Sequence, residues 1–332
     1  MSLSVLMLAN FSRHPKKYFS QINQFLFADA HHEQLGIFRF ILCGTLFYMA
    51  CFRQLNIDQL GIDSLIPRDL ALNVFPDFYR PAVQWFFWPD AFVGPVHLLL
   101  IGLLFLATIG LTNRPLLILT WIIHQGILNR NYAILFGADV IGGLFLFYLS
   151  FTHCTEFFSV RNLIFKSKNK ITSLIDTSGF LKNQQTAELH VNLSAVCFRL
   201  IQVQICTIYM YTGFEKLKGN TWWDGTALWT VFANPQFSQY DLKFLSQVPV
   251  LFAIGTFLSL IFEIYFPAMV INSKFRNFWL VSGVLFHVGI GVLLGLMTFS
   301  MVMLSTYVLF LDRQTIVNAL PRWQFFPFQK AS

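Results

Sequence analysis

The sequence predicts an all-α fold, a polytopic transmembrane helical bundle of about eight spans. Hydrophobic residues make up 55% of the 332 residues and charged residues only 12%, whereas soluble domains carry roughly a quarter charged residues. The mean hydropathy is +0.58, and the apolar residues gather in runs close to the ~20 residues that a membrane-crossing helix needs. This composition excludes an ordinary soluble domain.

Polar or proline-containing loops separate the first six expected spans, each an apolar run with few charges. These spans are 36–52, 91–111, 115–128, 132–151, 191–213 and 248–271. The last apolar stretch, 278–311, would be about 50 Å long as one helix, which exceeds a hydrocarbon core of about 30 Å. We therefore expect two short spans that turn near 295–298.

The chain divides into a cytoplasmic or interfacial N-terminal segment, 1–34, a transmembrane domain, 35–312, and a short cytoplasmic tail, 313–332. Within the first segment, 18–27 has the pattern of an amphipathic surface helix. With both termini on one side, 14 of the 23 Lys and Arg fall on that side and seven on the other. Because basic loops favour the cytoplasm, both termini are expected there.

The basic residues and the cysteines suggest no further class of partner or site. The pI is about 9.2, but basic residues in a multi-pass protein usually set its topology, so no nucleic-acid partner is expected. The five cysteines lie mostly within apolar runs without paired spacing. We therefore expect neither a disulfide framework nor a metal site.

The stretch 209–225 is the most informative part of the sequence. It places Glu215 and Lys216 at the end of an apolar run, and a lysine held partly out of water loses its proton more readily and can act as a base. The alternative is a lysine that snorkels over an interfacial aromatic belt. Four aromatic residues flank the lysine as candidate cofactor-binding residues: Tyr209, Tyr211, Trp222 and Trp223.

Ionisable side chains inside apolar runs indicate a functional interior, because a charge that faces lipid is costly. The alternative is structural: each arginine would pair with one of the two carboxylates and only hold the bundle together. His97 and His124 are expected to make interhelical hydrogen bonds. The four charged intramembrane candidates are Arg39, Asp139, Arg199 and Glu263.

Three further residues could share a cavity with Lys216 on the exterior side. Asn131 and Tyr132 open the fourth expected span at the depth of Lys216. His287 lies about a third of the way into its own span. These four residues are the candidate catalytic group.

The sequence from 204 to 217, followed by Trp-Trp-Asp-Gly at 222–225, resembles the core of the HTTM domain. This is the membrane domain shared with vitamin K-dependent gamma-carboxylases. Leu-Gly-Ile-Phe-Arg-Phe at 35–40 resembles the opening of that domain, and 129–137 and 286–305 resemble two later blocks. The four blocks follow the family order across nearly the whole chain.

The resemblance implies a role for each matching residue. In the carboxylases the residue that matches Lys216 deprotonates vitamin K hydroquinone, whose reaction with oxygen yields a strong base that allows glutamate carboxylation and leaves the quinone as its epoxide. The residues that match Asn131 and His287 line the same pocket. The implied cofactor is a reduced quinone of the vitamin K or menaquinol type, and no metal is expected.

The chain departs from the carboxylase pattern at three points. Tyr132 stands where the carboxylases have a histidine, and Glu215 stands beside Lys216 where they have a second lysine. The sequence also ends shortly after the membrane domain, so the large luminal domain that completes the carboxylases is not expected. These departures put vitamin K-driven carboxylation in doubt.

Two functions follow as hypotheses. The first is a stand-alone, quinol-linked membrane enzyme with an exterior-facing cavity, which acts on a quinol, a small peptide or a lipid. The second is a non-catalytic or accessory protein of a bacterial toxin or peptide maturation system, because the chain resembles the short HTTM proteins of such systems. The expected partners are the lipid bilayer, a small peptide or protein substrate and companion membrane proteins, and the expected location is the bacterial inner membrane.

Overall fold

The computed structural model confirms an all-α transmembrane bundle. It describes residues 31–319, apart from 62, 65, 132–134, 165–183, 235–238 and 241–245, together with 23, 26 and 27, and within these residues the regular structure is entirely helical. Five helices are long and apolar enough to cross a membrane. They are α3 (His32–Gln54), α6 (Asp90–Ile109), α10 (Gln184–Lys216, with its apolar part Leu193–Lys216), α13 (Pro249–Ile271) and α14 (Ser273–Leu293).

Shorter helices supply the remaining expected spans. These are α7 (Arg114–Asn129), α8 (Gly137–Ser150), and α15 (Met297–Ser305) continued by the 3-10 helix η5 (Thr306–Phe310). All eight expected apolar segments are therefore helical, although three are shorter than a helix that alone spans a bilayer. The expected surface helix at 18–27 lies almost wholly outside the described residues.

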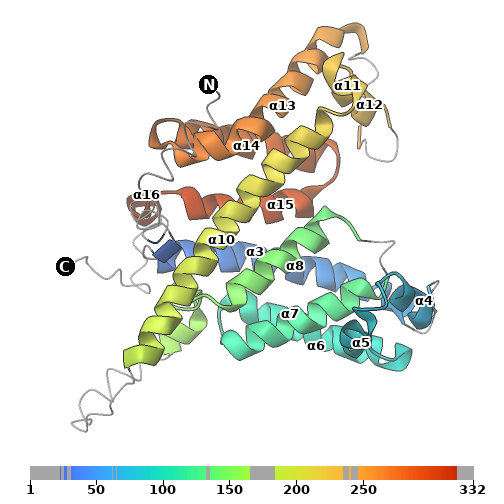
Figure 1. The fold of residues 1–332 in the computed structure, drawn as a ribbon, viewed down its shortest axis with the longest axis vertical. Helices are drawn as coiled ribbons and strands as arrows, with labels where there is room; N and C mark the ends of the chain where they lie inside the picture. Colours follow the sequence, from blue (N-terminus) through green and yellow to red (C-terminus); the bar gives the residue numbers. More distant parts are fainter. Residues whose placement is uncertain are drawn as a thin grey trace.

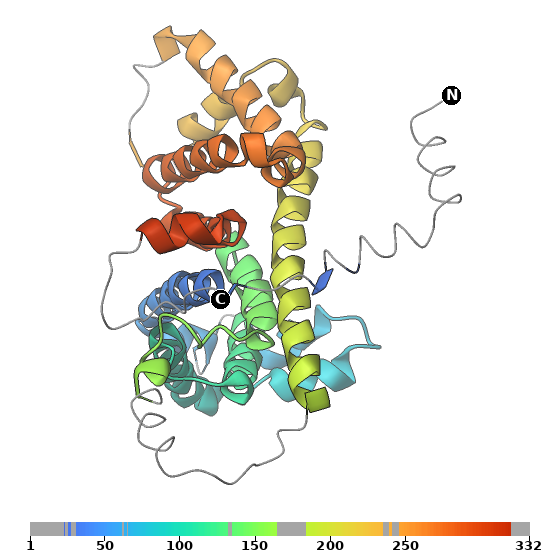
Figure 2. The same ribbon diagram turned by 90° about the vertical axis from the view of Figure 1, so that its left-hand side faces the viewer.

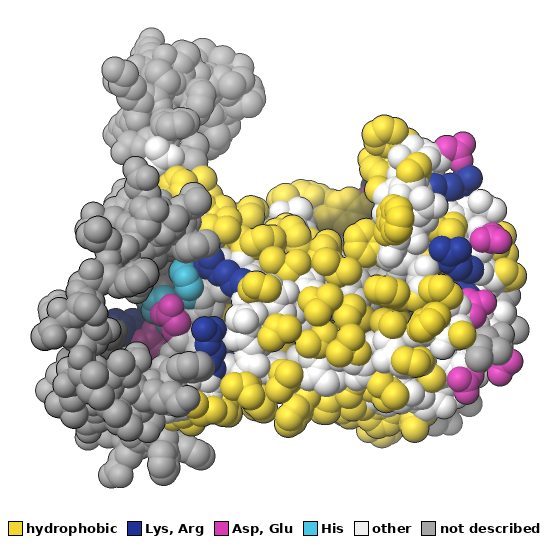
Figure 3. Space-filling model, turned by 90° about the horizontal axis from the view of Figure 1, so that it is seen from below, with side chains coloured by type: hydrophobic (Ala, Val, Ile, Leu, Met, Phe, Trp, Pro, Cys, Tyr) yellow, Lys and Arg dark blue, Asp and Glu magenta, His cyan; other side chains and the backbone are white. Residues whose placement is uncertain are grey.

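The long helix α10 crosses the molecule diagonally (Figure 1). Helices α13, α14 and α15 lie toward the upper end of α10, and α3, α6, α7 and α8 toward its lower end (Figures 1 and 2). The short helices α4 (Arg68–Asn73), α5 (Arg80–Val83), α11 (Asn220–Trp223) and α12 (Ala227–Ala233) lie toward one edge, and α16 (Arg313–Ala319) lies toward the opposite edge. Figure 3 shows a broad apolar surface with charged side chains at its two ends, as expected for a protein embedded in a membrane.

The helix ends follow local sequence signals. Asn113 accepts a hydrogen bond from the Leu116 backbone N–H at 3.0 Å and so caps α7. Gly110 ends α6 in the left-handed conformation, with φ of 75°. Gly295, with φ of 70°, separates α14 from α15, which confirms the expected break in the last apolar stretch. The turn occupies 294–296, at the start of the expected range.

The expected ion pairs of Arg39 are wrong. Arg39 is fully buried and donates to the backbone carbonyls of Cys154, Ala107, Thr108 and Phe158. Two of these carbonyls belong to the last turn of α6, whose C=O groups have no partner within the helix. Arg39 therefore fixes the end of α6 to the segment that follows α8.

The two intramembrane carboxylates have other partners than expected. Asp139 accepts a hydrogen bond from Arg53 at 2.6 Å, and Arg53 lies about 21 Å along α3 from Arg39 at 1.5 Å per residue. Glu263 pairs with Lys216. Arg199 donates to the Gln202 Oε1 atom at 2.8 Å, so neither arginine reaches a carboxylate of the expected pair. Position along the helix axis decides these contacts.

Candidate functional site

An ion pair between Lys216 and Glu263 joins the end of α10 to α13. The Lys216 Nζ atom donates to Glu263 Oε1, and the side chains are 25% and 5% exposed. Gly213 allows this approach, because a Cβ atom there would lie 2.8 Å from Ile264 Cγ1 and 3.1 Å from the Ile264 backbone N. Lys216 lies three residues after Gly213, on the same face of α10. The close approach of the two helices at Gly213 therefore brings the lysine to the carboxylate of Glu263. The pair neutralises both charges inside the bundle.

A hydrogen-bonded chain of three buried side chains lies next to this ion pair on α10, α14 and η5. The Tyr209 Oη atom lies 2.5 Å from His287 Nε2 and 2.7 Å from Tyr307 Oη. All three residues are at most 5% exposed. The Tyr307 ring packs against Gly283, where a Cβ atom would lie only 2.2 Å from the Tyr307 hydroxyl. A bare glycine one turn before His287 thus lets η5 close onto α14.

Two buried polar atoms of this region have no hydrogen-bond partner among the described residues. They are Nδ1 of His287 and Oε2 of Glu263. The hydroxyl chain admits two directions, so His287 Nε2 either accepts from Tyr209 or donates to it. In either direction Nδ1 stays open, as a donor in the first case and as an acceptor in the second when the ring is neutral. Such orphaned atoms are uncommon in buried positions and call for a ligand or water.

The four flanking aromatic residues do not share one position. Tyr209 is buried, and its ring centroid lies 4.2 Å from that of Phe266. Trp222 covers the ion pair, with Lys216 Nζ 5.0 Å from its ring centroid, a cation–π distance. Tyr211 and Trp223 are 63% and 62% exposed. Trp223 nevertheless donates its indole N–H to the Leu217 carbonyl at 2.7 Å, so Trp222 and Trp223 both lie beside Lys216, whereas Tyr209 bonds to His287 and Tyr307.

Asn131 lies in a neighbouring cavity of about 380 Å³, lined also by Arg53, Phe136 and Thr298. Asn131 itself is 7% exposed. The start of α15 connects this cavity with the histidine: Thr298 lines the cavity, and the ring centroid of the adjacent Phe299 lies 5.9 Å from that of His287. The fourth catalytic candidate, Tyr132, lies outside the described residues.

Lys218 differs from Lys216 in its surroundings. Its side chain is 71% exposed and donates to Glu215 Oε1 at 2.6 Å. The hydrogen bond from Lys218 to the carboxylate raises the pKa of this lysine. Lys218 is thus a solvated cation, and Lys216 is the lysine of this loop that reaches the bundle interior.

Comparison with known proteins finds similarity over part of the chain. Residues 156–314 match the HTTM domain family, and this segment contains Tyr209, Lys216, Glu263, His287 and Tyr307. The sporulation-delaying protein SdpB of Bacillus subtilis (strain 168) is 33% identical over 119 residues, which are 34% of this chain and 36% of SdpB. The match thus spans about a third of that relative's length. No solved structure matches the chain.

Tyr307 is the residue of this polar cluster that sequence reasoning missed. It lies in the last apolar run after Ser305 and Thr306, and it is 98 residues from Tyr209, its hydrogen-bond partner. Only the break at Gly295 turns its helix back against α14. A tyrosine within an apolar run indicates that its buried hydroxyl has a hydrogen-bond partner. The sequence does not show which residue that partner is.

Proposed function

We propose that this chain is a membrane component of a bacterial system that matures a small secreted peptide. It would act in the inner membrane, with both termini cytoplasmic and the Lys216 region on the exterior side, together with companion membrane proteins. The similarity to a sporulation-delaying protein supports this proposal, as does the match of residues 156–314 to the HTTM domain family, because this segment contains the whole polar cluster. SdpB itself is matched over only part of its length.

The observation that carries the proposal is a pair of buried atoms, His287 Nδ1 and Glu263 Oε2, that have no hydrogen-bond partner among the described residues. The carboxylate oxygen can only accept a hydrogen bond, and the imidazole nitrogen, when it carries the proton, can only donate one. A peptide group offers one N–H donor and one C=O acceptor. The two orphaned atoms therefore suit a segment of peptide backbone in the apolar interior.

The ion pair indicates how Lys216 would take part. A lysine that serves as a base needs a neutral amine directed at its substrate, but here the amine donates to Glu263. This arrangement favours a binding and positioning role, in which Trp222 covers the pair and the pair orients the carboxylate toward a bound peptide.

The direct test is deletion of the gene in its own bacterium, followed by mass spectrometry of the small secreted peptides. We expect one secreted peptide to disappear or to change mass, and the wild-type gene to restore it. Glu263→Gln and His287→Phe should restore it poorly, whereas Lys218→Gln, which changes an exposed cation outside the cluster, should restore it fully. An unchanged set of secreted peptides after deletion would contradict the proposal.

Quinol-linked chemistry is the second candidate, favoured by the position of Lys216 beneath the Trp222 ring. The donor chemistry fits a quinol in part: a ring hydroxyl could donate to Glu263 Oε2, and the ring could lie against Trp222. When bound, the quinol would supply the reducing equivalents. The chain's own contribution would be to orient the ring and to hold a proton at Glu263 or His287, and Lys216 would act as a base only after leaving its carboxylate. Menaquinone in the lipid extract of the purified protein, at a constant ratio to protein, would support this candidate.

A further inference from the structure

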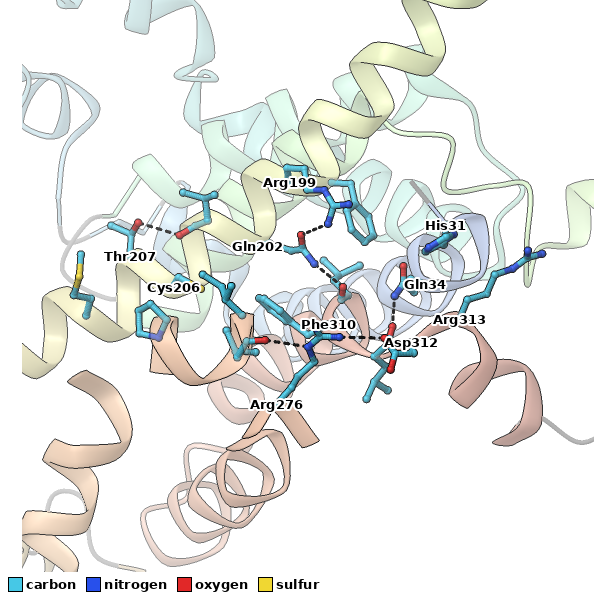
Figure 4. A pocket seen from close by; sticks show the side chains of 18 residues that line it. His31, Gln34, Arg199, Gln202, Cys206, Thr207, Arg276, Phe310, Asp312 and Arg313 are labelled. Carbon is cyan, nitrogen blue, oxygen red and sulfur yellow. Dashed lines mark hydrogen bonds and ion pairs between the residues drawn. The ribbon is translucent and has the colours of Figure 1, made fainter. Parts of the chain in front are cut away.

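A second amphipathic site lies at the other end of α10. A cavity of about 500 Å³ is enclosed by α10, the last turns of α13 and the segment from η5 to α16 (Figure 4). Arg199, which lines it, precedes Lys216 by 17 residues, or about 26 Å along the helix. This distance is close to the thickness of a bilayer core. The cavity therefore lies near the opposite membrane face from the Lys216–Glu263 ion pair.

One end of this cavity is rich in guanidinium groups. Arg276 donates to the Val270 carbonyl at 3.0 Å and to Asp312 at 3.1 Å. Arg199 and Arg313 also line the cavity, and Figure 4 shows that the Arg313 side chain extends away from Arg199 and Arg276. Asp312 is the only carboxylate among the described lining residues, and its side chain is 70% exposed. Three arginines and one solvated carboxylate therefore line the wall, and Arg276 is the arginine that pairs with this carboxylate.

A second carboxylate, Glu33, pairs with Arg313 from outside the lining, at 2.8 Å. Including it, the described residues at this end supply three guanidinium groups and two carboxylates. Arginine is the side chain best suited to bind phosphate, because its planar donors match the phosphate oxygens.

The rest of the wall is apolar, apart from one orphaned amide oxygen. Phe198, Val203, Met210 and Pro267 form much of the apolar surface. Gln34 is 3% exposed, and its amide nitrogen donates to the Leu311 carbonyl, while its Oε1 atom has no partner among the described residues. This atom lacks a hydrogen-bond donor, which a bound molecule can supply.

We propose that this cavity binds an anionic phospholipid of the phosphatidylglycerol type. Its phosphate would lie between Arg199 and Arg276, an acyl chain would follow the apolar wall along α10, and a glycerol hydroxyl would donate to Gln34 Oε1. Phosphatidylcholine satisfies these features less well, because its headgroup brings a cation beside the arginines and has no hydroxyl or N–H donor. Basic pockets between membrane helices bind anionic headgroups for the same reason.

The test compares lipids and variants on the purified full-length protein in detergent. Native mass spectrometry would count retained lipid after titration with phosphatidylglycerol or phosphatidylcholine of equal chain length, and thermal unfolding would be followed in parallel. We expect phosphatidylglycerol to bind about tenfold more tightly. Arg199→Gln should weaken that binding about fivefold, and Arg199→Lys, which keeps the charge, should weaken it less.

Lys274→Gln is the matched control, because Lys274 is an exposed cation close to Arg276 in sequence that does not line the cavity. It should leave phosphatidylglycerol binding unchanged. Inorganic phosphate and glycerol phosphate separate a lipid site from a simple anion site, and neither should raise the melting temperature at the concentration at which the lipid does. Equal binding of the two lipids, equal losses in Arg199→Gln and Lys274→Gln, or full stabilisation by phosphate alone would each overturn the proposal.

Discussion

The ion pair between Lys216 and Glu263 joins two membrane helices through partners that are not equally buried, at 25% and 5% exposure. Loss of one partner from a buried pair costs about 3–5 kcal/mol, because the other charge stays behind without compensation. Lys216→Met leaves the more deeply buried carboxylate alone and should show this full cost. Glu263→Gln leaves a flexible ammonium that can extend toward water, so its cost should be roughly half of that.

The double variant Lys216→Met/Glu263→Gln removes both charges and should lie within about 1 kcal/mol of the wild type. Reversible unfolding in mixed micelles would give the four free energies of unfolding, and the coupling energy of the cycle isolates the pair. The matched control is Lys218→Gln, which removes an exposed cation two residues away and should have almost no effect. Equal costs for the two single variants, with a double variant equal to their sum, would refute the assignment of a coupled and unequally buried pair.

Three further predictions follow from packing, topology and ligand binding. Gly283→Ala should lower the melting temperature by several degrees, because the added Cβ would meet the Tyr307 ring, whereas Gly289→Ala on the same helix has nothing within 4 Å and should be neutral. On a cysteine-free background, Lys218→Cys should react with an impermeant thiol reagent from outside and Lys274→Cys only after the inner face is opened; the reverse would invert the topology. If a quinol binds, a menaquinol analogue should quench Trp222 fluorescence saturably, and quenching linear in ligand would indicate partitioning into detergent.

The sequence predicted the helices of the bundle because a membrane leaves few alternatives. Backbone groups in lipid need partners within their own segment, so an apolar run such as 248–271 is expected to be a helix, and α13 occupies Pro249–Ile271. The break in the last run was predictable for a similar reason, since 34 apolar residues exceed the bilayer. Gly295 supplies the positive φ that this turn uses.

Side-chain partners were less predictable, because they depend on how helices pack. Arg39 binds backbone carbonyls, and every residue carries such an acceptor, so no sequence pattern identifies the four that it contacts. The chain from Tyr209 to His287 and Tyr307 joins residues 78 and 98 positions apart. Lys216 and His287 were identifiable from family blocks, whereas Tyr307 becomes visible only once η5 lies against Gly283.

The distribution of charge along α10 separates the two proposed sites. At one end the buried charges are matched one to one, Lys216 with Glu263, so this region attracts neither cations nor anions strongly and selects a ligand through its orphaned donor and acceptor. Around the cavity at Arg199, three arginines and two carboxylates are found among the described residues, and guanidinium groups suit an anion. A neutral peptide group suits the first environment and a phosphate suits the second. The same helix can thus contact a peptide at one membrane face while a lipid headgroup fixes its depth at the other.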